Sequence, residues 1–351
     1  MNATELLREL SEASGVSGYE TEAGAIARRA FEPHADAISS DALGNIIALK
    51  RGDRAPDAPR RAIMLAAHVD EIGLMVKGYE DGFVRVATVG GVDLRTIVGQ
   101  EVVVHGARPL PGIVGSRPPH VLSPEERQKA VPLDDLFIDV GLSQESLEEV
   151  VRVGDLITMR REMVELAEGY VSGKAFDDRA GVVSLALCLE SLSTLRHAWD
   201  VYAVGTSQEE VGLRGATVSA YGVAPDVAIA VDVGFGAQQG MDEKESITMG
   251  GGPAIAKGPN IHPVMFDRLV ETAKAHEVTY QVEYAAGATG TDAWAIQVAR
   301  EGIPTALLSV PLRYMHTSVE TLNVRDMERT GRLMALFIAG LDEAFASQVG
   351  I

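Results

Sequence analysis

Residues 201–212 read VYAVGTSQEEVG, and this stretch carries the clearest information about the fold. The apolar run 201–205 predicts a buried β-strand, and Gly212 belongs to a turn that follows it. Two adjacent glutamates, Glu209 and Glu210, stand where the strand gives way to the turn. Neighbouring carboxylates repel each other, so stability alone does not account for this pair. A metal site uses both, because one carboxylate binds a cation while the other moves protons. Successive side chains of an extended strand end point to opposite sides, which predicts that only one of the two glutamates faces its metal directly.

Outward from this stretch, strand and helix patterns alternate along the chain. Apolar runs at 45–49, 62–67, 227–231, 280–283 and 306–310 predict further strands, and helical patterns fall between them. Such alternation is typical of a sheet covered by helices on both faces. The sequence therefore predicts a three-layer α/β/α domain.

The middle of the chain has a different texture. From residue 73 to about 163, short apolar runs are separated by glycines and prolines, at 74–77, 83–86, 101–104 and 112–114. This pattern predicts a small all-β barrel or sandwich. We expect residues 1–70 and 165–351 to form one discontinuous α/β domain and residues 71–164 to form an inserted β-domain. The polar stretch 123–129 is expected to be a mobile loop.

The composition excludes several classes of protein. The formal net charge is −19, from 50 acidic against 31 basic residues, which argues against nucleic acid and anionic membrane as partners. No apolar run approaches the roughly 20 residues of a membrane span. The single cysteine, Cys188, rules out an intrachain disulfide and is expected to be a buried core thiol. The N-terminus reads as a capped helix, so a cytoplasmic location is expected.

Metal-binding side chains gather where predicted strands end. In open α/β sheets, sites form at the carboxyl ends of the strands. Each of these side chains has an ordinary structural alternative: an aspartate can cap a helix or a turn, and a histidine can be a hydrogen-bonded loop residue. Their conjunction favours a functional site. The set consists of His68, Asp70, Asp177, Glu209, Glu210, Asp232 and His316.

Two imidazoles and three carboxylates suit a pair of zinc-like cations. One carboxylate then has to bridge the two ions. Three carboxylates and a bridging hydroxide balance the charge of two dications, which lowers the cost of burying them. Asp70, two residues after His68, is placed to accept the second N–H of that imidazole and to fix its tautomer.

The same residues lie in motifs that resemble those of the tetrahedral (TET) aminopeptidases, also called glutamyl or deblocking aminopeptidases. The similarity covers nearly the whole chain, in the family's order, and no ligand position departs from it. AHVDEIG at 67–73 resembles the first metal motif, GKAFDDRAG at 173–181 the bridging-aspartate motif and QEEVGLRGA at 208–216 the catalytic-glutamate motif. AVDV at 230–233 and RYMHTS at 313–318 resemble the last two ligand motifs, and 115–120 with 135–141 resemble the inserted domain.

The resemblance implies a role for each candidate residue. One metal ion would be held by His68, Asp177 and Asp232. The other would be held by Asp177, Glu210 and His316, with Asp177 bridging. Glu209 would be the general base and acid, and Asp70 would support His68. Two divalent ions per subunit are expected, with zinc favoured and cobalt or manganese also suited to these N and O ligands.

The implied activity is that of a metal-dependent aminopeptidase. It would remove N-terminal residues from peptides through a dinuclear centre with a bridging water. The inserted domain would mediate dimerisation, and six dimers would build a tetrahedral dodecamer. The preferred side chain at the cleaved residue does not follow from the sequence.

Two other functions are compatible with the pattern. One is another hydrolase on the same scaffold, because some relatives carry a cellulase label; a glycosidase, however, needs a carboxylate pair and no metal. The other is a non-catalytic metal-binding scaffold. Two segments also have open interpretations. Residues 287–293 are either a helix cap formed by Thr291 or Asp292 or a substrate-contacting loop, and His120 reaches an active site only if its loop is mobile.

Overall fold

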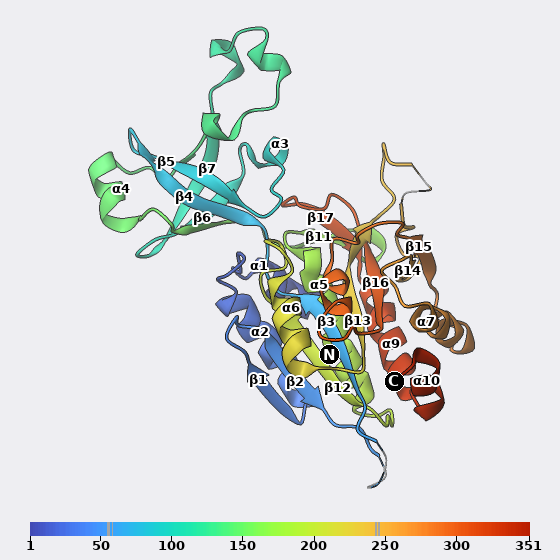
Figure 1. Ribbon diagram of the computed structural model, residues 1–351. Coiled ribbons are helices and arrows are strands. Elements are labelled where there is room, and N and C mark those ends of the chain that lie inside the picture. Colours follow the sequence, from blue (N-terminus) through green and yellow to red (C-terminus); the bar gives the residue numbers. More distant parts are fainter. Residues whose placement is uncertain (55–56, 58, 243, 245) are drawn as a thin grey trace.

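A computed structural model describes residues 1–54, 57, 59–242, 244 and 246–351. Its larger part is built on one mixed sheet with helices on both faces (Figure 1). The strands run across this sheet in the order β1 Ala37–Ser40, β2 Ile46–Lys50, β12 Asp200–Thr206, β3 Ala62–His68, β13 Val227–Phe235, β16 Thr305–Leu312, β14 Ala254–Lys257 and β15 Gln281–Tyr284.

The four central strands β12, β3, β13 and β16 are parallel, so their carboxyl ends meet at one edge of the sheet. They are buried along nearly their whole length, as their continuous apolar sequences predict. Thr206 at the end of β12 pairs with His68 at the end of β3. The register therefore sets the glutamate pair after β12 next to the histidine after β3.

Helices cover the sheet on both sides. α5 and α9 pack against each other and with α1 on one face, while α6 and α8 pack together on the other. Cys188 lies in α5 and is fully buried, as predicted. The helices are α1 Ala3–Glu12, α2 Thr21–Phe31, α5 Phe176–Leu192, α6 Arg214–Val223, α7 Pro263–Ala275, α8 Asp292–Gln297, α9 Val324–Ala339 and α10 Glu343–Val349.

A closed six-stranded barrel stands beside the α/β part (Figure 1). Alternate residues of its strands, such as Leu74, Val76 and Val84, are buried inside it. The predicted fold class, a three-layer α/β/α domain with an inserted β-barrel, is confirmed. The barrel strands are β4 Gly73–Glu80, β5 Phe83–Val89, β8 Leu136–Asp139, β7 Pro109–Ser116, β6 Glu101–His105 and β9 Leu156–Met159.

The barrel segment also contains helices that the sequence pattern did not reveal. α3 spans Leu94–Ile97, and α4 spans Gln144–Val150, where the side chain of Ser143 caps the first turn. The polar stretch 123–129 lies within an exposed excursion between β7 and β8 that contains short 3₁₀ turns. Its expected mobility stays a prediction, as do the domain limits 71 and 164.

A small antiparallel sheet completes the architecture. It consists of β10 Val164–Glu165, β11 Tyr170–Gly173 and β17 Glu320–Asn323, and it pairs Gly173 with Glu320. This pairing brings the chain before α5 beside the chain after His316. Among the described residues, no helix is both long enough and apolar enough to cross a bilayer.

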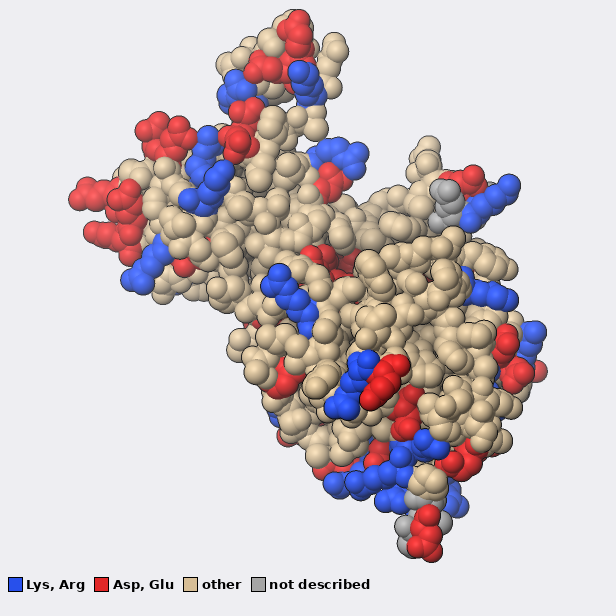
Figure 2. Space-filling view, in the orientation of Figure 1, with Lys and Arg blue, Asp and Glu red and all other residues tan. Residues whose placement is uncertain are grey.

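Basic and acidic side chains are intermixed over the face of the molecule in Figure 2. Acidic side chains also lie in the hollow between the barrel and the α/β part. This hollow is where the strand ends of the central sheet approach the barrel.

Candidate metal centre

The ends of the central strands, the start of α5 and the loops after β12 and β16 bring the five predicted ligands together around Asp177. Nε2 of His68 lies 3.1 Å from Oδ1 of Asp177, and Nε2 of His316 lies 3.3 Å from Oδ2 of the same side chain. Nε2 of His316 is also 3.5 Å from Oε1 of Glu210. Asp177 therefore has one carboxylate oxygen directed at each imidazole.

The side chains form two groups with the geometry of metal sites. His68, Asp177 and Asp232 each offer a ligand atom within 4.8 Å of the others, and so do Asp177, Glu210 and His316. Both groups contain only N and O donors, and Asp177 belongs to both. The residues present therefore fit two adjacent divalent cations that share one carboxylate.

Asp177 does not cap a helix, so that structural alternative is wrong. The backbone of Asp177 is extended, with φ −77° and ψ 105°, and the peptide bond to Asp178 is cis. The capping interaction comes from the next residue, because Oδ1 of Asp178 accepts a 3.0 Å hydrogen bond from the N–H of Gly181. The carboxylate of Asp177 is left to face the two histidines.

Asp70 has a wider role than support of His68. Nδ1 of His68 lies 3.2 Å from the backbone carbonyl oxygen of Asp70 and 3.5 Å from its carboxylate. The carboxylate also accepts hydrogen bonds from the hydroxyl of Ser17 and from the backbone N–H groups of Glu209 and Glu210, at 2.6, 3.0 and 3.1 Å. Burial alone would raise the pKa of Asp70, but His68 and these donors hold it below its usual value.

The glutamate pair does not lie on an extended strand end, which corrects the sequence-based expectation. β12 ends at Thr206, and Gln208 has a left-handed backbone with φ 55°. The loop takes this shape because Asp70 holds the N–H groups of both glutamates and Glu20 accepts from the N–H of Gln208 at 3.1 Å. The strict alternation of a strand therefore does not separate the two side chains.

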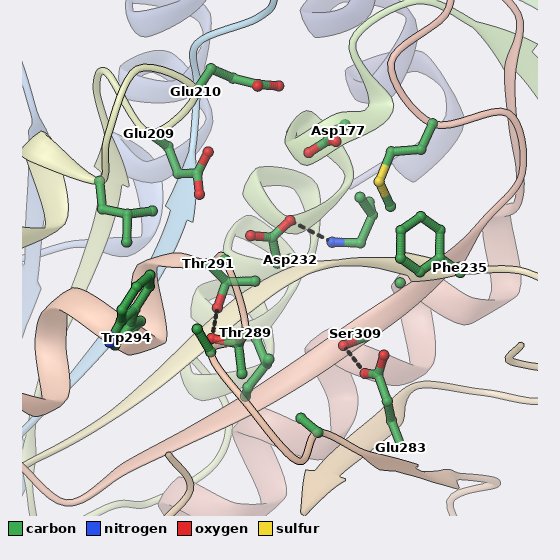
Figure 3. A pocket seen from close by; sticks show the side chains of 18 of the residues that line it. Asp177, Glu209, Glu210, Asp232, Phe235, Glu283, Thr289, Thr291, Trp294 and Ser309 are labelled. Carbon is green, nitrogen blue, oxygen red and sulfur yellow. Dashed lines mark hydrogen bonds between the residues drawn. The ribbon is translucent and has the colours of Figure 1, made fainter. Parts of the chain in front are cut away.

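The two glutamates nevertheless have different surroundings. Glu210 belongs to the group of Asp177 and His316, whereas Glu209 belongs to neither group. Oε2 of Glu209 lies 3.9 Å from Nε2 of His68. Figure 3 shows both carboxylates on the side of the pocket where Asp177 and Asp232 lie.

Asp232 lies within β13 and not at its end, because this strand continues to Phe235. Its Oδ1 accepts a hydrogen bond from the N–H of Val233 at 2.7 Å. Asp232 therefore does not cap a turn, which was its structural alternative, since the next residues, including Gly234, continue the strand. Asp232 is 6 % exposed and belongs to the same group as His68.

The candidate site gathers several buried carboxylates. Burial raises the pKa of Glu209 to about 10 and that of Glu210 to about 7, and it raises the pKa of Asp232 well above its usual value. The hydrogen bond to Asp177 raises the pKa of His316 to about 9. These shifts arise because several carboxylates are buried close together, and two dications at this place would relieve the repulsion, so the electrostatics also fit a pair of cations.

Glu320 is a positioning residue that the sequence did not reveal. It is 2 % exposed, and its two carboxylate oxygens accept from the backbone N–H of His316 at 2.9 Å and of Asp177 at 3.2 Å. Burial raises its pKa well above the usual value. The role of Glu320 depends on the pairing of β11 with β17, which the sequence analysis did not predict.

A buried ion-pair network supports the site from behind. Oε2 of Glu71 accepts from Lys174 at 2.7 Å, and Oε1 accepts from Arg179 at 3.2 Å and from the N–H of Gly15 at 3.0 Å. Arg179 is fully buried and also donates to the backbone carbonyls of Leu10 and Ala13. The network ties α1, the chain after His68 and the start of α5 to one another.

A pocket of about 660 Å³ opens beside the metal groups. Residues 288–291 line it, which agrees with the loop interpretation of segment 287–293. Thr291 stands at the N-cap position of α8 without a capping hydrogen bond from its side chain, and Asp292 accepts from Thr206 at 2.6 Å instead. The capping alternative for these two side chains is therefore wrong. His120 lies in the exposed excursion, and its conditional reach to an active site through a mobile loop stays untested.

The sequence profile of the M42 glutamyl aminopeptidase family matches residues 44–333. The chain belongs to this family. The resemblance inferred from the motifs is thereby confirmed, and so is the enzyme class, since M42 proteins are aminopeptidases and depend on metal. The alternative of a non-catalytic metal-binding scaffold is not supported.

Two similar proteins cover nearly all of the M42 chain. Lysyl aminopeptidase of Pyrococcus furiosus is 37 % identical over 337 residues, 94 % of each chain. The structure of aminopeptidase APDkam598 from Desulfurococcus kamchatkensis is 37 % identical, with a TM-score of 0.91, and the match covers 99 % of this chain and 98 % of that one.

A third similar protein bears on assembly. The TET1 peptidase of Pyrococcus horikoshii is 31 % identical, with a TM-score of 0.83 and coverage of 97 % of this chain and 100 % of that one. That protein assembles into a tetrahedron or a large octahedral shell.

Proposed function

We propose that this M42 chain releases N-terminal residues from peptides, using two divalent cations per subunit and Glu209 as the base. The observation that carries the proposal is the sharing of Asp177 by two ligand groups. In this assignment, His68, Asp177 and Asp232 hold one cation, and Asp177, Glu210 and His316 hold the other. Zinc is favoured by the donor set, and cobalt or manganese also suits it.

Two cations held by these residues would supply Lewis-acid chemistry, lowering the pKa of a water molecule and stabilising negative charge on the substrate oxygen. The proton of that water goes to Glu209. Glu209 is 8 % exposed, and its carboxylate lies near His68, outside both ligand groups. The protonated Glu209 then delivers the proton to the leaving amine. Asp70 holds the backbone of Glu209 in place for both transfers.

Peptide N-termini are the proposed substrates. The free α-ammonium group is positively charged, and the pocket beside the metal groups is rich in carboxylates. A chain end also fits a pocket that receives one side chain, whereas cleavage inside a protein requires a groove open at both ends. These features favour an exopeptidase over an endopeptidase.

We propose that the chain forms homo-oligomers, with dimers joined through the β-barrel and assembled into a dodecamer. The barrel projects from the α/β part (Figure 1) and exposes apolar side chains such as Val98, Ile113 and Val153. Native mass spectrometry tests this state: a mass of twelve chains supports it, and a monomer contradicts it. The cytoplasmic location and the absence of nucleic acid and membrane partners stay predictions from the sequence.

The activity is tested on metal-stripped protein reconstituted with one metal at a time. We expect hydrolysis of fluorogenic aminoacyl substrates only after metal is restored, and no hydrolysis of the same substrates with an acetylated α-amino group. Cellulose serves as the rival substrate. Cellulose hydrolysis that persists with a chelator, or an inert metal-loaded protein, would contradict the proposal.

A further inference from the structure

Glu283 is an acidic side chain in the catalytic pocket that the proposed chemistry does not use. It lies on β15, is partly buried and lines the pocket of about 660 Å³ together with Glu209, Asp232 and His316. Figure 3 shows Glu283 across the pocket from the two glutamates of the candidate metal centre. Glu283 would therefore face the far end of a substrate side chain that enters the pocket from the candidate metal centre.

One oxygen of this carboxylate is left for a ligand. The hydroxyl of Ser309 on β16 donates a 2.6 Å hydrogen bond to Oε2 of Glu283. Within the described part of the chain, Oε1 has no hydrogen-bond partner. Gly234 allows Ile247 to pack closely in this region, because a Cβ at this position would lie only 2.4 Å from Cδ1 of Ile247 and 3.5 Å from Oε1 of Glu283.

Among the residues that the structure describes, no lysine or arginine forms an ion pair with Glu283. The described lining residues of the pocket include neither lysine nor arginine. Lys257, on the neighbouring strand β14, holds its ammonium group 4.7 Å from the ring of Phe266 in α7, where it interacts with the aromatic face. Burial raises the pKa of Glu283, and the Ser309 hydroxyl only partly opposes this effect. A cationic ligand would relieve the cost of keeping this carboxylate charged.

The pocket walls suit a long aliphatic stem. The aromatic side chains of Phe235 and Trp294 lie on opposite sides of the pocket in Figure 3, and Leu213 and Met315 also line it. Such walls pack against the methylene groups of a long basic side chain while its charged end reaches a carboxylate. A short or acidic side chain would leave Glu283 unpaired or would be repelled by it.

We propose that Glu283 selects peptides whose N-terminal residue is lysine or arginine, by pairing with the cationic end of that side chain. This inference rests on the aminopeptidase function proposed above. The competing role for Glu283 is recognition of the α-ammonium group. That group is bonded to the carbon next to the scissile carbonyl and therefore stays beside the metal ligands, on the side of the pocket opposite Glu283.

The test compares kcat/KM for lysyl, arginyl, leucyl and glutamyl 7-amido-4-methylcoumarin in metal-loaded wild-type protein and in Glu283→Gln. The amide variant keeps an acceptor for Ser309 and removes only the charge. We expect wild-type protein to prefer the lysyl and arginyl substrates. In Glu283→Gln we expect kcat/KM for both to fall about 10- to 100-fold, mainly through KM, with leucyl hydrolysis within about 3-fold of wild type. Glu271→Gln on the exposed face of α7 is the matched control.

The possible results distinguish failure of the proposed selectivity from failure of the aminopeptidase function on which it rests. Equal losses for all four substrates would assign Glu283 to the α-ammonium group and would overturn the selectivity. A wild-type preference for leucyl or glutamyl substrate would overturn it as well, while leaving the aminopeptidase function intact. Absence of hydrolysis for all four substrates in wild-type protein would instead refute the function itself. Glu283→Lys is a second test. We expect its kcat/KM for the glutamyl substrate to rise above that of wild-type protein, and an unchanged value would contradict the selectivity.

Discussion

The carboxylate of Asp70 accepts a 3.0 Å hydrogen bond from the backbone N–H of Glu209. The same carboxylate accepts from the N–H of Glu210 and lies 3.5 Å from Nδ1 of His68. One side chain therefore links the glutamate loop to the end of β3, where His68 lies. The two N–H groups bond different oxygens of Asp70, so an asparagine would set its NH₂ group against one of them. We expect Asp70→Asn to keep the fold and to lower kcat about 10- to 100-fold. Steady-state kinetics with metal-loaded protein check this, and an unchanged kcat would show that the clamp has no role in turnover.

Glu209→Gln separates proton transfer from metal binding. Because Glu209 lies outside both ligand groups, the variant is expected to retain both cations. Turnover is expected to fall about 10²- to 10⁴-fold, since the amide cannot accept the proton of the attacking water. Metal analysis and peptide hydrolysis are measured on the same preparation. Near wild-type turnover would show that another group is the base.

His316→Ala removes one ligand from the group that contains Glu210. The other group is untouched, so one cation per chain should remain. Elemental analysis after dialysis measures this, with Glu271→Gln as the control. Full occupancy by two cations in the variant would exclude His316 as a ligand.

Glu320→Gln tests the second carboxylate clamp, which holds the N–H groups of Asp177 and His316. The amide replaces one acceptor oxygen by a donor, so one buried N–H loses its partner. We expect the free energy of unfolding of the metal-free protein to fall by about 1–3 kcal/mol. Urea denaturation of both proteins measures the change. A loss equal to that of Glu271→Gln would mean that Glu320 does not stabilise the loops.

Metal removal is expected to make stability fall as pH rises. Burial raises the pKa of Glu210 to about 7 and that of Glu209 to about 10, from 4.5 for an ordinary glutamate. Above pH 4.5 the folded metal-free protein therefore binds more protons than the unfolded chain. Its free energy of unfolding falls as the pH rises, until Glu210 has lost its proton at about pH 7 and Glu209 at about pH 10. The Tm of chelator-treated protein should drop between pH 6 and 9 more steeply than that of metal-loaded protein. Parallel Tm curves would contradict this linkage.

Much of the site could be predicted from the sequence because its residues follow recognisable apolar strands. His68 comes at the end of one such run, and the register of β3 with β12 sets it beside the glutamate loop. The barrel was also readable, since glycines and prolines interrupt runs with strand periodicity. Both predictions depend on local patterns that survive in the folded chain.

The errors come from features that only tertiary contacts determine. The left-handed backbone of Gln208 depends on hydrogen bonds to Glu20 and Asp70, so the strand-like alternation assumed for the glutamates could not be corrected from the sequence. Glu320 acquires its role only when β17 pairs with β11. The place of Glu283 in the pocket depends on the position of β15, which local sequence patterns do not determine. Helix α4 is too short, with Leu147 as its buried residue, to produce a clear periodicity.

The most direct test of the central claim is anomalous diffraction from crystals of zinc-reconstituted Glu209→Gln. The account predicts two peaks per chain, about 3.5–4 Å apart, with a carboxylate oxygen of Asp177 bound to each ion. It predicts His68 and Asp232 at one ion and Glu210 and His316 at the other. A single ion per chain, or two ions that do not share Asp177, would contradict it.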